Sequence, residues 1–343
     1  MSLAPPGRMR GCRAVPWPTS PATPPSAAEA PCSVPHHGMV AFCQVRGGTP
    51  DIAGMSVTDL PFDVARQQLD AEAAACAIHK LRPGLVMLGR SVVLGPDDLA
   101  PVAEAASSVG ALTIYDASHV AGLIAGGVFP NPLETGIDMM TMSTHKTLGG
   151  PTGAIVCGRR TSDGEAFTST VNRAFLANQD ASRYPVLLAS LLPFCDGTDE
   201  APRVIDNATV FKAALEAEGL PTLLPGEIAA SHQFVVPTGK LPETLSLMRA
   251  LENASILVGR CPHPGTPDGY GLRFGTQYAT RLGLGTTEME AAARIVGRLM
   301  GRRDATARLV EGHAEKIPNV CEAIQSLLAP FSINKDRAPY EAT

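Results

Sequence analysis

The feature that most constrains the fold is an alternation of short apolar runs with helix-type patterns, which begins near residue 55. Residues 85–88 form an apolar run that ends at Gly89, as a buried strand would. Residues 97–99 then open a helical pattern with one apolar face, and Gly110 closes it. Further strands are expected at 111–115, 137–142 and 154–157. This order predicts an α/β fold with a mainly parallel sheet and helices on both faces.

The last third of the chain predicts a smaller α/β layer. Helical periodicity predicts helices at 201–218, 243–254 and 287–300. Short apolar runs predict strands at 234–236 and 271–275. We therefore expect a large domain over 55–200, a small C-terminal domain over 201–330 and a tail over 331–343.

Residues 1–54 differ in composition from the rest. Residues 1–50 hold 10 of the 30 prolines of the chain, without apolar periodicity. Proline at this density opposes both helix and sheet, so the stretch predicts a disordered leader. The alternative is that it is not natural coding sequence.

Composition narrows the classes of function. A formal net charge of −5 and an aromatic content of 5% argue against a nucleic-acid partner, which would need a basic face. No apolar run approaches the roughly 20 residues of a membrane span. The 8 cysteines are scattered, without zinc-type spacing, which indicates reduced thiols, a cytoplasmic protein and no metal site.

Two polar residues stand where expected strands end. Asp116 ends one strand, and Lys146 follows another within a segment rich in small and hydroxyl residues. Ligands of parallel sheets bind beyond the carboxyl ends of the strands. A lysine that binds a carbonyl cofactor, with an acid for the pyridinium nitrogen, is what a pyridoxal phosphate (PLP) enzyme needs. Taken singly, Asp116 reads more readily as a helix cap or a loop carboxylate, and Lys146 as a solvated surface charge.

The surrounding motifs resemble the serine hydroxymethyltransferase family of PLP-dependent, fold type I enzymes. They are Tyr-Asp-Ala-Ser-His-Val-Ala-Gly-Leu-Ile-Ala-Gly-Gly at 115–127, Phe-Pro-Asn-Pro-Leu at 129–133 and Ser-Thr-His-Lys-Thr-Leu-Gly-Gly-Pro at 143–151. Asp116 and Lys146 lie 30 residues apart in this arrangement.

The resemblance implies a role for each matching position. Lys146 would bind PLP covalently, Asp116 would pair with the pyridinium nitrogen, and His119 would lie beside the ring. Arg273 would grip the substrate carboxylate with its two-pronged guanidinium group. The remaining cofactor-binding positions implied are Ser91, Ser143 and His145.

The resemblance also implies the reaction: cleavage or transfer at the α-carbon of serine, glycine or threonine, with tetrahydrofolate as a co-substrate and a homodimer as the assembly. Segments 59–63, 231–233 and 275–277 resemble the threonine transaldolase-like branch, which needs no folate. A truncated, non-catalytic remnant is the alternative of another class. A plain aminotransferase shares the lysine and the acid but not their context.

The sequence departs from the family at several positions. The resemblance covers residues 57–330, and residues 1–56 offer no counterpart of the family's phosphate-binding turn or ring-stacking histidine; His36 and His37 lack its context. Thr152 stands where a basic residue is expected, and residues 177–179 replace a glycine pair. The expectation is an N-terminally truncated chain that binds PLP weakly or is inactive.

Overall fold

The computed structural model describes residues 32–34, 49–176, 180–197, 199–263, 265–303, 309–311 and 317–331. The chain divides into two compact units, residues 1–202 and 203–343, and each is considered by itself. The tail expected at 331–343, apart from residue 331, lies outside the described residues, as do positions 177–179 and the two histidines at 36 and 37.

The first unit alternates strands and helices, as the sequence predicts. Its elements are β1 (Cys32–Val34), α1 (Thr49–Ile52), β2 (Val57–Asp59), β3 (Phe62–Asp63), β4 (Gln68–Leu69), α2 (Ala71–Leu81), β5 (Leu85–Gly89), α3 (Ala100–Val109), β6 (Leu112–Asp116), α4 (Ala121–Ala125), the 3₁₀ helix η1 (Pro132–Thr135), β7 (Met139–Ser143), β8 (Ala154–Gly158), α5 (Thr161–Ala174), α6 (Arg183–Asp196) and the start of α7 (Glu200–Ala217).

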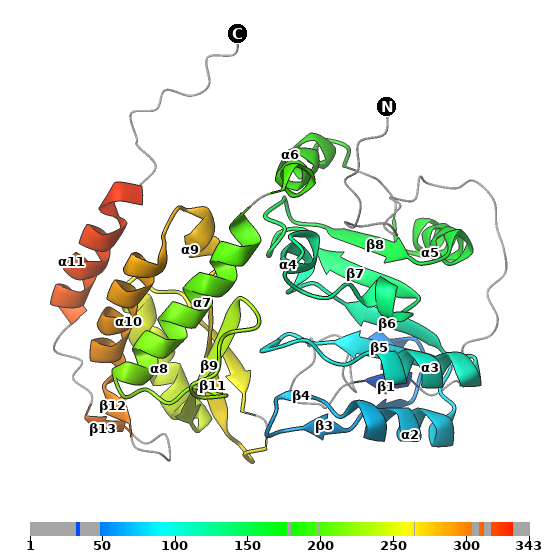
Figure 1. Ribbon diagram of the computed structural model, residues 1–343, viewed down its shortest axis with the longest axis horizontal. Helices are drawn as coiled ribbons and strands as arrows, with labels where there is room; N and C mark the ends of the chain where they lie inside the picture. The colour runs from blue at the N-terminus through cyan, green and yellow to red at the C-terminus, as the bar shows by residue number, and fades with distance from the viewer. Residues whose placement is uncertain are drawn as a thin grey trace, which may run out of the picture. The chain divides into compact units, whose positions relative to one another are not determined.

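The main sheet of this unit is mainly parallel, which confirms the expected fold class. Its strand order is β2-β1-β5-β6-β7-β8, seen in part in Figure 1. β1, β2, β5, β6 and β7 pair in parallel, whereas β8 is antiparallel to β7. β8 runs back because a loop over residues 144–153, rather than a helix, connects it to β7. The parallel strands therefore place their carboxyl ends together at one edge.

Local sequence explains the helices beside this sheet. α2 begins after Asp70, whose carboxylate accepts the Ala73 amide, and this bond satisfies one of the helix's exposed N–H groups. α3 ends at Gly110, whose N–H bonds to the carbonyls of Ala106 and Ser107. Both helices turn their small apolar residues inward, where Ile78 and Ala106 are fully buried. Helix formation and core formation thus use the same residues.

Two elements occur inside the stretch expected to be disordered. β1 (Cys32–Val34) pairs with β2 and β5, and α1 covers Thr49–Ile52. The structure differs from the composition-based expectation at these positions. β1 occupies the proline-free residues between Pro31 and Pro35, and since proline lacks an N–H for the ladder, the two prolines bound a short strand.

The second unit is a small α/β layer. Besides the rest of α7 it contains β9 (Gln233–Gly239), α8 (Leu241–Asn253), β10 (Gly259–Pro262), β11 (Tyr270–Gly275), α9 (Gln277–Arg281), α10 (Thr286–Met300), β12 (Arg302–Arg303), β13 (Leu309–Glu311), α11 (Ile317–Leu328) and the 3₁₀ helix η3 (Ala329–Phe331). Its main sheet is antiparallel, in the order β10-β11-β9. Phe211, Phe234 and Phe274 form an aromatic core with ring centroids 5.3–5.7 Å apart.

Candidate functional site

The expected site lies at the carboxyl edge of the main sheet. Gly89 at the end of β5 is in register with Asp116 at the end of β6, and Asp116 is in register with Thr141 of β7. The half-buried Asp116 carboxylate accepts the Ser118 amide at 2.9 Å, which fixes the turn that leaves the strand. This turn carries His119.

Gly89 makes the close pairing at this edge sterically feasible. Its φ is +86°, and a Cβ atom added there would lie 2.3 Å from the Asp116 carbonyl oxygen. Any other residue would push β5 and β6 apart at the point where Asp116 projects. The glycine that ends the strand pattern in the sequence is therefore required by packing.

The loop after β7 carries Lys146 and docks on helix α4. The Gly122 amide donates to the Thr147 hydroxyl at 2.9 Å, and a Cβ on Gly122 would lie 2.2 Å from the Thr147 carbonyl oxygen. The loop closes on itself as well, since the Gly150 amide donates to the Thr144 carbonyl at 2.7 Å. The backbone on both sides of the lysine is therefore fixed.

The docked loop brings the expected lysine to the expected histidine. Lys146 Nζ lies 3.1 Å from His119 Nε2, and both side chains are half-buried. At this distance the two nitrogens form a hydrogen bond, and the imidazole tautomer decides which one donates. Lys146, His119 and Asp116 thus belong to neighbouring segments at a single sheet edge.

Ser91 lies in the loop that follows β5, and a buried ion pair closes this loop. Arg90 Nη2 lies 2.9 Å from Asp97 Oδ1, with side chains 2% and 7% exposed. Asp97 also accepts the Leu69 amide at 2.8 Å, and the Arg90 guanidinium lies 5.3 Å from the Phe62 ring centroid. The pair fixes the start of the loop, so it positions Ser91 at the sheet edge.

The sequence patterns gave no signal for this pair. The partners are seven residues apart in an irregular loop, so neither helical nor strand periodicity links them. An arginine directly after a buried strand, followed by an acid within the same loop, is the only local cue.

Ser143 and His145 flank the lysine at different depths. Ser143 is the last residue of β7 and is half-buried, whereas His145 is exposed. Tyr115, directly before Asp116, is buried, and burial, with the nearby Asp97 carboxylate, raises its phenol pKa far above the ordinary value. Tyr115 is therefore a neutral core residue beneath the site.

Arg273 lies on β11 of the second unit and is half-buried. Burial lowers the pKa of its guanidinium group, which nevertheless remains charged at neutral pH. A Cβ added to Gly259, its partner in register on β10, would lie 3.4 Å from the guanidinium nitrogens. The glycine therefore leaves room for the arginine side chain. Burial also raises the pKa of the neighbouring Cys261 thiol to about 11.

Two negative findings concern only the part of the chain that the structure describes. In those residues no cluster of three histidine, cysteine, aspartate or glutamate side chains is arranged to hold a metal ion. Among the same residues no helix has both the length and the apolar character to cross a bilayer.

Comparison with known sequences identifies similar proteins. The family model "Serine hydroxymethyltransferase" matches residues 51–296. The serine hydroxymethyltransferase of Pyrobaculum neutrophilum is 34% identical over 262 residues, 74% of this chain and 60% of that protein. The enzyme of the same name from Methanopyrus kandleri is 34% identical over 280 residues, 79% of this chain and 64% of that protein. The chain thus spans about 60% of the length of such relatives.

Comparison with solved structures supports the fold. The L-threonine transaldolase of Pseudomonas fluorescens superposes with a TM-score of 0.73 at 24% sequence identity, covering 87% of this chain and 68% of that one. At this identity the likeness establishes the α/β architecture of fold type I and nothing finer.

Proposed function

Because the chain belongs to the serine hydroxymethyltransferase family, we propose that it performs PLP-dependent aldol-type cleavage or transfer at the α-carbon of serine, glycine or threonine. Tetrahydrofolate would be the one-carbon acceptor if serine is the donor. The observation that carries the proposal is the 3.1 Å approach of Lys146 Nζ to His119 Nε2 at the edge where Asp116 ends its strand.

The residues present fit the ring and aldehyde parts of PLP. Lys146 provides a half-buried amine for the cofactor aldehyde. Asp116 provides a carboxylate that suits a protonated pyridine nitrogen. Ser91, Ser143, His145 and His119 supply the polar groups proposed to hold the cofactor. When bound, PLP supplies a ring that accepts the electrons left by a bond broken at the α-carbon.

The protein's own groups bind, orient and move protons. Arg273 would hold the substrate carboxylate through two parallel N–H donors. His119 Nε2 would receive a proton from Lys146 Nζ or return it, because the two atoms are already within hydrogen-bonding distance. Asp116 would keep the pyridine nitrogen protonated, and the bond from the Ser118 amide holds its carboxylate in place.

Threonine transaldolase chemistry is the second candidate, and one observation in the second unit favours it. The segments at 231–233 and 275–277, which resemble that branch, meet: the Thr276 amide donates to the His232 carbonyl at 3.1 Å. A Cβ on Gly275 would lie 2.7 Å from Gln277 Oε1 and 3.6 Å from the His232 ring. Segments distant in sequence thus form a single local structure beside Arg273.

The assembly, location and domain limits are part of the same proposal. We propose a homodimer, supported by apolar side chains of α6 that lie in solvent in this single chain: Tyr184, Val186, Leu188 and Leu192 are 49–59% exposed. We propose a cytoplasmic location, consistent with free thiols at Cys76, Cys195 and Cys261. We also propose residues 55–200 as the cofactor-binding domain and 201–330 as the small domain.

The test begins with an absorbance titration of the purified chain with PLP. We expect a saturable band of protein-bound cofactor that is absent in Lys146→Ala and kept in Lys80→Ala, a control on the exposed surface of α2. The loaded protein is then incubated with serine and tetrahydrofolate, or with threonine alone. Glycine from serine supports the hydroxymethyltransferase, and acetaldehyde from threonine supports the transaldolase. Cofactor binding without turnover would support a non-catalytic remnant, and no saturable binding would overturn the proposal.

A further inference from the structure

A second polar site lies at the opposite end of the strands that carry the PLP site. A cavity of about 260 Å³ opens at the amino end of β6 and β7. Its lining comes from the end of α3, the start of β6 and the residues that flank β7 and β8, namely Ala103, Ser107, Gly110, Ala111, Leu112, Gly136, Asp138, Arg159 and Arg160. All of these residues belong to the first unit.

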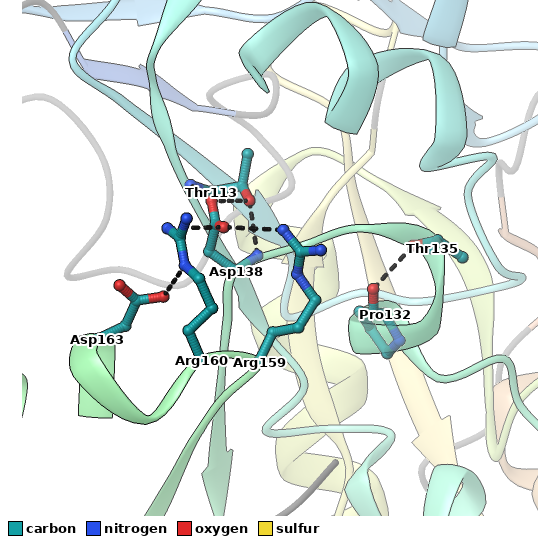
Figure 2. Close-up of polar contacts among 7 residues, drawn as sticks. All are labelled: Thr113, Pro132, Thr135, Asp138, Arg159, Arg160 and Asp163. Carbon is teal, nitrogen blue, oxygen red and sulfur yellow. Dashed lines mark hydrogen bonds and ion pairs between the residues drawn. The ribbon is translucent and has the colours of Figure 1, made fainter. Parts of the chain in front are cut away.

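The Asp138 carboxylate at this cavity is saturated by the protein itself. Its Oδ2 accepts the Thr113 amide at 3.0 Å and the Thr113 hydroxyl at 2.9 Å. Its Oδ1 accepts Nη2 of Arg159 and Nη2 of Arg160, both at 3.3 Å, and Figure 2 shows the two guanidinium groups on either side of it. Asp138 therefore has no acceptor capacity left for a ligand.

The two arginines keep unused donors. Arg160 Nε donates to Asp163 at 2.8 Å (Figure 2). Within the described residues, Nε and Nη1 of Arg159 and Nη1 of Arg160 have no further acceptor. The two side chains are 46% and 58% exposed, so these N–H groups are accessible. The two arginines thus keep donors that a ligand in the cavity could use.

Charge and hydrogen bonding together define the ligand. The cavity lining contains two guanidinium groups and one carboxylate. Asp163, which is not part of the lining, forms an ion pair with Arg160. Because Asp138 and Asp163 balance the two positive charges, a ligand would be held by the unused N–H donors of Arg159 and Arg160 rather than by an excess of charge. We propose that this cavity binds the oxyanion group, carboxylate or phosphate, of a small metabolite.

The volume limits the size of that metabolite. The cavity lies just below the roughly 300 Å³ at which pockets for drug-sized ligands begin, so its occupant is smaller than a nucleotide cofactor. The proposal does not depend on the PLP chemistry, because the two sites lie at opposite ends of β6 and β7 and share no residue.

The experiment is isothermal titration calorimetry of the purified full chain with inorganic phosphate and, separately, with succinate. Sodium chloride holds the ionic strength constant, because exposed charges are screened by salt. We expect saturable binding of at least one probe, and the tighter of the two identifies the oxyanion class. Arg159→Gln and Arg160→Gln should each weaken binding about tenfold or more, as expected for the loss of a charge-assisted hydrogen bond.

Two control variants test whether the measured binding takes place at this cavity. Arg294→Gln removes an arginine of similar exposure, which pairs with Glu290 on α10 in the other unit, and should leave binding unchanged. Lys146→Ala should also leave it unchanged; loss there would reassign the anion to the PLP site and overturn the proposal. Absence of saturable binding with both probes, or cavity variants that bind as tightly as the unsubstituted protein, would overturn it too. If Arg159→Gln fails to fold, the more exposed Arg160→Gln decides alone.

Discussion

The two ends of the central strands use charged residues in opposite ways. At the carboxyl end, Asp116 and Lys146 lie in or beside segments that leave the sheet, and contacts from neighbouring backbone hold these segments. At the amino end, Asp138 is surrounded by four donors from two other segments of the chain. We propose that the first arrangement positions groups for a ligand, whereas the second one uses a carboxylate to join strands.

The comparison implies that substitution should affect chemistry at one end and stability at the other. A charge held by many internal donors is costly to remove, because its partners lose their compensation. A charge aimed at a ligand is cheap to remove in the unliganded protein. Stability and cofactor-dependent chemistry can therefore be measured on the same variants.

The largest effect is expected for Asp116→Ala. Loss of the acid proposed for the pyridine nitrogen should slow cofactor-dependent exchange of the glycine α-hydrogen by on the order of a hundredfold or more. The measurement is exchange in D₂O followed by nuclear magnetic resonance. The control is Asp98→Ala, which removes an exposed acid whose carboxylate accepts the Ala100 amide. Equal exchange rates in Asp116→Ala and the unsubstituted protein would remove Asp116 from the site.

Asp138→Ala should give the largest loss of stability. The substitution leaves two guanidinium groups and the Thr113 donors without their acceptor, and breaking such a partly buried pair costs about 3 kcal/mol. The free energy of unfolding in urea measures the effect. A loss below about 1 kcal/mol would show that the carboxylate is not what joins the strands at this end.

Gly122→Ala should have an intermediate effect, which lowers both the free energy of unfolding and the affinity for PLP. The added Cβ would lie 2.2 Å from the Thr147 carbonyl oxygen, so the Lys146 loop must shift. Overpacking of this kind costs about 2 kcal/mol, and the shift should also weaken PLP binding. Urea unfolding and the PLP titration measure the two effects.

Gly285→Ala provides the control for that substitution. Its nearest contact is the flexible end of Glu288, 3.3 Å from the added Cβ, so the unfolding free energy should fall by less than in Gly122→Ala and PLP binding should not change. If Gly122→Ala retained both its stability and its affinity for PLP, the loop would not be fixed by its packing on α4.

The contrast between the two ends also explains what the sequence could predict. Alternating patterns predicted β5, α3, β6 and β7, because in these segments periodicity directly reflects burial. The positions of Asp116 and Lys146 at the carboxyl end were predictable because both residues follow strand patterns, and their role in a site stays a prediction. The direction of β8 was not, since an apolar run carries no information about which way the strand runs.

The amino-end cluster could not be predicted from local patterns. Asp138 meets Thr113, 25 residues earlier, and Arg160, 22 residues later. Such a pairing is created by the order of the strands rather than by any motif. The Arg90–Asp97 pair was missed for a related reason: its loop has no repeat, and only the folded structure shows that both side chains are buried.

The smallest loss of stability is expected for Arg160→Gln. This substitution therefore separates the contribution of the amino-end cluster to stability from its contribution to oxyanion binding. Asp138 retains Arg159 and both Thr113 donors, and a pair whose arginine is 58% exposed contributes less than about 1 kcal/mol. The same substitution should nevertheless weaken oxyanion binding about tenfold, since a ligand would rely on the Nη1 donor that the protein leaves unused. Urea unfolding and calorimetry on one protein sample separate the two effects. A stability loss as large as that of Asp138→Ala, with anion binding intact, would mean that Arg160 serves the strands alone and that the two ends differ less than we infer.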